Sequence, residues 1–85
     1  MSEDQLRKDL EALRAERDRQ ENMAGPSRER LNQLIADIER RLDQPDEDEN
    51  LVERLRDDLA HFEVDHPTVA AALETMLNTL SNAGI

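Results

Sequence analysis

The stretch HFEVDHPTVAAALETMLNTL, residues 61–80, decides the fold, because it combines a helix-breaking corner with the most apolar helix of the chain. Its second part repeats apolar residues at spacings of 4, 3 and 4, the period of one helix face. These residues are Val69, Leu73, Met76 and Leu80. Ala70 and Leu77 widen the face on one flank and Ala72 on the other. A helix that is apolar around most of its circumference usually lies at the centre of its fold.

The first part of the stretch predicts a corner between two helices. Pro67 suits the first turn of a helix, where its missing N–H costs nothing. Asp65, or alternatively His66, is expected to cap that helix. Phe62 and Val64 are expected to end the preceding helix and to pack inward.

The two histidines of the chain leave two alternatives open at this corner, a metal site and a partner-binding corner. His61 and Asp65 are four residues apart and share one helix face. Glu63, however, lies about 200° from His61 at 100° per residue, and His66 follows the break. A zinc site needs three or four convergent ligands. The pattern therefore favours a structural corner, and we predict no metal and no cofactor.

Working outward, the sequence predicts an all-α protein, a small antiparallel bundle of four helices with short connections. The expected segments are an N-terminal amphipathic helix in residues 1–24 and a helical core in residues 27–85, with helices at about 27–43, 46–64 and 66–83. Ser27 is expected to cap the second helix, and Asp46 the third. The first helix has a narrow stripe of Leu6, Leu10 and Leu13, which fades after three turns. We therefore expect it to be loosely attached.

Composition excludes several classes of function. Of the 85 residues, 36% are hydrophobic and 1% aromatic, and there is no cysteine. A thiolate metal site, a disulfide and a cysteine nucleophile are thus excluded. No glycine-rich phosphate loop and no Ser–His–Asp pattern is apparent. We predict that the protein is not an enzyme, with a metal-dependent hydrolase centred on His61 and His66 as the opposing hypothesis.

The net charge of −10 is concentrated in the third quarter of the chain, where residues 45–66 hold nine acidic residues and two arginines. This segment would repel nucleic acid backbones, and no stacking rings compensate. An arginine patch around the first loop is the opposing feature, formed by Arg14, Arg17, Arg19, Arg28 and Arg30. We expect these arginines to pair with nearby acids, and we predict no nucleic acid partner.

The chain resembles a family of short bacterial helical proteins known only as domain of unknown function 4404. The resemblance rests on the segment LIADIERRL at 34–42, the corner F-E-x-x-H-P at 62–67 and the ending VAAALETMLNTLSNAGI at 69–85. It covers most of residues 28–85. It implies the helical architecture and no particular activity, because the family has no assigned catalytic residues.

These observations predict a small acidic interaction protein, an adaptor or regulator in the cytoplasm, without a membrane-spanning segment. We expect a homo-oligomer, with a dimer favoured, because so short a chain has little protein to surround its last helix. The predicted self-association residues are Val69, Leu73, Met76, Leu77 and Leu80, with Leu6, Leu10 and Leu13. The alternative is an acidic decoy that occupies a nucleic-acid-binding protein in place of DNA.

Overall fold

Leucine-rich amphipathic segments fold into four helices. The computed structural model describes residues 2–44 and 50–83. Its helices are α1 (Ser2–Arg19), α2 (Gly25–Asp43), α3 (Leu51–Asp65) and α4 (Pro67–Ala83), and the described residues contain no strand. The prediction of an all-α bundle of four helices is confirmed.

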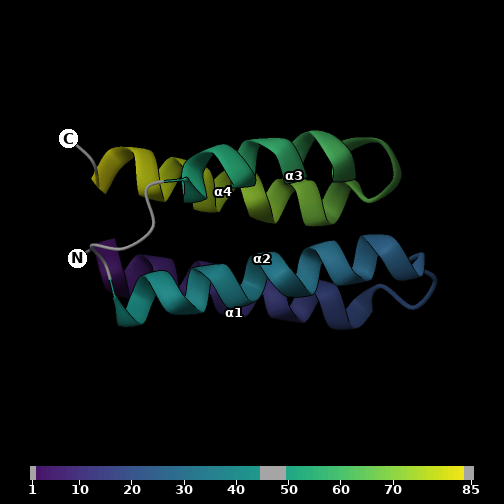
Figure 1. Ribbon diagram of the computed structural model, residues 1–85, viewed down its shortest axis with the longest axis horizontal. Helices are drawn as coiled ribbons and strands as arrows, with labels where there is room; N and C mark the ends of the chain where they lie inside the picture. Colours follow the sequence, from purple (N-terminus) through teal and green to yellow (C-terminus); the bar gives the residue numbers. More distant parts are fainter. Residues whose placement is uncertain (1, 45–49, 84–85) are drawn as a thin grey trace.

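The helices form two layers, with α1 beside α2 in one and α3 beside α4 in the other (Figure 1). The start of α1 and the end of α4 lie at one end of the bundle, and consecutive helices run in opposite directions (Figure 1). α1 packs against α2 and α4, while α3 packs against α2 and α4. This is the up-down-up-down arrangement that short connections favour.

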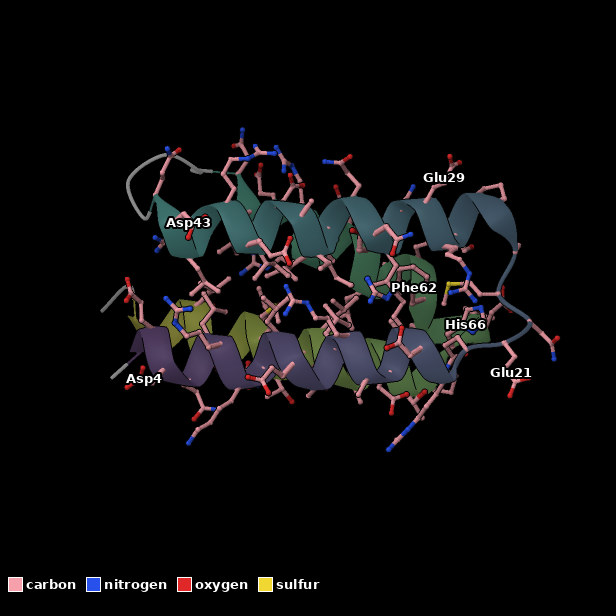
Figure 2. The ribbon with its side chains drawn as sticks, turned by 90° about the horizontal axis from the view of Figure 1, so that it is seen from below. Asp4, Glu21, Glu29, Asp43, Phe62 and His66 are labelled. Atoms are coloured by element: carbon pink, nitrogen blue, oxygen red, sulfur yellow. The ribbon has the colours of Figure 1, made fainter. Side chains whose placement is uncertain are left out.

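The core is aliphatic and is shared by all four helices. Its buried residues are Leu6, Leu10, Leu13, Met23, Leu31, Leu34, Ile35, Ile38, Leu42, Leu51, Leu55, Phe62, Val69, Ala70, Leu73 and Met76. In the view of Figure 2, Phe62 appears between the ribbons of α1 and α2, and its side chain is fully buried. The radius of gyration of 12.1 Å equals the value of about 12 Å expected for a compact single domain of this length.

The prediction that the first helix is loosely attached is wrong. Leu6 and Leu10 are each 4% exposed, and Leu13 is 0% exposed. A buried carboxylate adds a polar link to α4, because Asp9 accepts a hydrogen bond of 2.6 Å from the Thr79 hydroxyl. A stripe of three leucines is enough here, because α4 presents a wide apolar face against which α1 packs.

Two predicted helix starts are corrected. α2 begins at Gly25, with Ala24 as its N-cap residue, so that Ser27 lies inside the first turn and does not cap. Pro26 is tolerated there because the first N–H groups of a helix have no intrahelical acceptor. α3 begins at Leu51 rather than at residue 46, and the predicted cap at Asp46 lies outside the described residues.

Candidate interaction surface

The corner between α3 and α4 is held by backbone hydrogen bonds on both sides of His66. His66 separates the two helices, its N–H donates to the Phe62 carbonyl at 2.8 Å, and its own carbonyl accepts from the Ala70 N–H at 3.0 Å. His66 thus takes the linking position between the helices. Asp65 is the exposed last residue of α3, so the expectation that it caps α4 is wrong.

This corner is tied to the connection between α1 and α2. His66 Nδ1 lies 2.9 Å from Gln20 Oε1, and Gln20 Nε2 donates to the Thr68 hydroxyl at 3.3 Å. Figure 2 places His66 at the same end of the bundle as Glu21, in this connection. Gln20 therefore links the α1–α2 connection to His66 and to Thr68, one residue on either side of Pro67.

His61 points to α2 instead. Its Nε2 lies 3.0 Å from Ser27 Oγ, while the Phe62 ring contacts the rings of both histidines edge-on. Within residues 2–44 and 50–83, no group of three or more His, Cys, Asp or Glu side chains could hold a metal ion. The two histidines thus contact different segments, His61 on Ser27 of α2 and His66 on Gln20 of the α1–α2 connection, and are not directed at one centre.

The contact between Ser27 and His61 resembles one half of a nucleophilic site, which sequence spacing alone did not reveal. Such a site also needs a group that orients the second ring nitrogen, and donors for an oxyanion. Asp58 precedes His61 by one turn, but its carboxylate accepts a hydrogen bond of 2.8 Å from Arg30 Nη1. The described residues give His61 Nδ1 no hydrogen-bond partner. The contact is therefore best explained as a link between α2 and α3.

Two ion pairs continue this link along the seam between α2 and α3. Arg30 pairs with Asp58, and Arg54 pairs with Asp37. Asp37, which is 3% exposed, also accepts hydrogen bonds from Arg40 at 3.2 Å and Gln33 at 3.3 Å. Burial raises the pKa of Asp58 above its usual 3.8, and the hydrogen bond and charge of Arg30 partly offset that increase. These buried carboxylates hold two helices together.

Four of the five arginines around the first loop form ion pairs within the chain, as expected from the sequence, and Arg28 hydrogen-bonds a backbone carbonyl instead. Arg14 pairs with Glu39, Arg17 with Asp18, Arg19 with Glu16 and Arg30 with Asp58, while Arg28 donates to the Gln20 carbonyl. Each of these arginines therefore has an acceptor within the chain.

Many carboxylates, by contrast, are exposed without an ion pair or hydrogen bond to a described residue. They are Glu3, Glu11, Glu21, Glu29, Asp43, Glu53, Asp57, Glu63, Asp65 and Glu74. The cations in the same condition are Arg7, Lys8 and Arg56. Among the exposed, unpaired charges of the described residues, acids therefore outnumber cations by ten to three, whereas the whole sequence has 21 acids and 11 Lys and Arg.

The outward side of α3 carries both exposed carboxylates and exposed apolar side chains. Glu53, Asp57, Ala60 and Val64 follow one another at spacings of 4, 3 and 4 and are all exposed. We call these four residues the α3 outer stripe. Val64 is 84% exposed and is the one large hydrophobic residue in the described chain that is classed as exposed. The expectation that Val64 packs inward is wrong, because it lies about 200° around the helix from the buried Phe62.

The residues predicted for self-association are mostly used inside one chain. Leu6, Leu10, Leu13, Val69, Leu73 and Met76 belong to the buried core. Leu77 and Leu80 are partly buried and pack against it. The reason given for a dimer is thereby corrected, because α1 and α3 of the same chain cover the apolar face of α4. Self-association itself stays a prediction.

Two further findings concern class and family. Over residues 2–44 and 50–83, no helix combines the length and the apolar character needed to cross a membrane. The chain is an acidic up-down-up-down four-helix bundle with a mixed acidic and apolar outer surface. The family model described as domain of unknown function (DUF4404) matches residues 6–85, so the chain belongs to this family. Searches of curated proteins and of solved structures found no match.

Proposed function

We propose that the protein is a non-enzymatic interaction protein, an adaptor or regulator, that binds a basic segment of a partner protein through α3. The observation that carries this proposal is the α3 outer stripe, where an exposed valine and alanine lie in line with two unpaired carboxylates. Aliphatic contact supplies affinity, and the carboxylates select a positively charged partner and steer its approach.

Several features support the choice of a basic partner. The net charge of the chain is −10, and most arginines are occupied by internal pairs. A nucleic acid is disfavoured for the same reason. The absence of cysteine fits a reducing compartment, and we place the protein in the cytoplasm.

A pair of double variants tests the proposal. Asp57→Lys with Val64→Lys changes the α3 outer stripe. Glu29→Lys with Ala36→Lys makes the same change in charge, at the same spacing, on exposed positions of α2. Figure 2 shows Glu29 pointing away from the bundle. Each protein is immobilised and exposed to a lysate of cells that express the chain, and bound proteins are identified by mass spectrometry.

We expect wild type and the α2 control to retain partners with basic segments, which salt releases, and the α3 variant to lose them. Identical sets of bound proteins on all three would contradict the proposal. A set dominated by DNA-binding proteins that exchange their DNA for this chain would favour the decoy hypothesis instead. No feature of the described residues favours that hypothesis, because the α3 outer stripe has its two carboxylates at one end and the apolar Ala60 and Val64 at the other, not a continuous row of acids.

Self-association is the second proposal, and it is restricted to the partly exposed Leu77 and Leu80 on α4. Light scattering of wild type and Leu77→Glu decides it. A dimer that Leu77→Glu dissociates would support self-association through α4, and a single-chain mass at every concentration would contradict it.

A further inference from the structure

A groove runs between α3 and α4 next to the α3 outer stripe. It has a volume of about 200 Å³ and is lined by Leu59, Glu63, Pro67, Ala70, Ala71 and Glu74. We call it the α3–α4 groove. Glu63 lies three residues from Ala60 on α3, so the groove and the stripe form one continuous surface.

The floor of the groove is apolar because α4 has small residues where it faces Leu59. Ala70 is buried, and Ala71 is exposed at the rim. Leu59 is itself only partly buried, although it packs against the core. The groove is smaller than a typical small-molecule pocket, which measures about 300–1,000 Å³. Its size is that of a single long side chain.

The rims of the groove are anionic. Glu63 on α3 and Glu74 on α4 are both exposed, and neither forms an ion pair with a described residue. Glu74 is the only charged residue of α4. The nearest unpaired cation on α3 is Arg56, seven residues and thus about 10 Å along the helix axis from Glu63. Two carboxylates therefore flank an apolar floor without a cation between them.

We infer that the α3–α4 groove receives an arginine side chain of the partner's basic segment, with its aliphatic part on Leu59 and Ala70 and its guanidinium between Glu63 and Glu74. The inference rests on the proposed function. Arginine suits this groove better than lysine, because its planar group presents several donors to two carboxylates while its methylene groups cover apolar surface. Lysine offers a compact charge that one carboxylate satisfies.

Three fluorescent peptides provide the probe. Each is an acetylated amphipathic 12-residue peptide with four lysines and one central position that holds arginine, lysine or citrulline, the neutral analogue of arginine. Binding to the full chain is measured by fluorescence anisotropy. We expect the arginine peptide to bind about tenfold more tightly than the citrulline peptide and several-fold more tightly than the lysine peptide.

Two variants and one matched control locate the effect. Glu63→Gln with Glu74→Gln should remove the preference for arginine, and so should Ala71→Leu, which fills the rim of the groove without a change in charge. Glu21→Gln with Glu29→Gln removes the same charge from exposed positions outside the groove and should retain the preference. Circular dichroism confirms that each variant is folded.

Each result leads to a distinct conclusion. Equal affinity for the three peptides, or a preference that survives both groove variants, overturns the groove while the proposed function stands. If no peptide binds wild type, a basic segment is not what α3 recognises, and the proposed function fails together with the groove.

Discussion

Replacing Leu13 by alanine tests whether α1 is part of the core. Leu13 is 0% exposed, so the whole side chain loses its packing partners. The removal of three carbon atoms costs about 2.4 kcal/mol at about 0.8 kcal/mol each. The cavity left behind adds to this cost, and buried leucine-to-alanine changes span about 2.7–5.0 kcal/mol. We therefore expect a loss of about 3–4 kcal/mol in the free energy of unfolding.

This loss is large for so small a chain. A stability of about 0.05–0.15 kcal/mol per residue gives about 4–13 kcal/mol for 85 residues. Urea unfolding followed by circular dichroism should show a midpoint lower by about 2–3 M, if the slope is near 1.5 kcal/mol per M. Glu11→Ala, at an exposed position of the same helix, is the control and should stay within about 0.5 kcal/mol of wild type.

A small effect would refute the reasoning. If Leu13→Ala cost less than about 1 kcal/mol with the slope unchanged, the packing of α1 on α4 would contribute little to the folded state. The first helix would then be loosely attached, as its narrow stripe alone had indicated.

Three further predictions concern the buried carboxylates and the assembly state. Because burial raises the pKa of Asp58 above 3.8, the folded state binds this proton more tightly than the unfolded state, so ionisation of Asp58 lowers the stability of the folded protein relative to its protonated form. The stability of Asp58→Asn relative to wild type should thus be most favourable near neutral pH and decline as the pH falls toward 3.8; urea titrations in which it rises would contradict this. Asp37→Ala should cost about 1–3 kcal/mol in the same assay, whereas Asp43→Ala, at an exposed position, should stay within about 0.5 kcal/mol. If Leu77 and Leu80 mediate self-association, light scattering behind a sizing column should give wild type the mass of two 9.8 kDa chains and Leu77→Glu the mass of one, and a single-chain mass of wild type at all concentrations would contradict that proposal.

Periodicity and turn chemistry were sufficient to predict four helices and the position of the corner, but not where α2 and α3 begin. The repeat of apolar residues from Leu31 to Leu42 predicts the buried face of α2, and the structure buries the first and the last residue of this repeat. Pro67 and the polar residues before it indicated where α3 ends. The same reasoning could have placed Val64 correctly, because a residue two positions after buried Phe62 lies on the opposite side of a helix.

Contacts between side chains on different helices could not be predicted from sequence patterns. The pairs Ser27 with His61 and Asp37 with Arg54 join residues 34 and 17 positions apart, and no local pattern specifies such pairing. The attachment of α1 was misjudged for a related reason. The burial of Leu13 depends on the width of the apolar face of α4. The leucine stripe of α1, considered alone, gives no information about the helix against which it packs.

The measurement that tests the central claim most directly is a chemical-shift titration of the ¹⁵N-labelled chain with the arginine-containing basic peptide at low and high salt. We expect the largest amide shift changes in residues 53–74, which span the α3 outer stripe and the α3–α4 groove, and we expect salt to reduce them. Changes centred on the exposed faces of α1 and α2, or no changes with peptide in excess at low salt, would contradict the claim that the outer surface of α3 binds a basic partner.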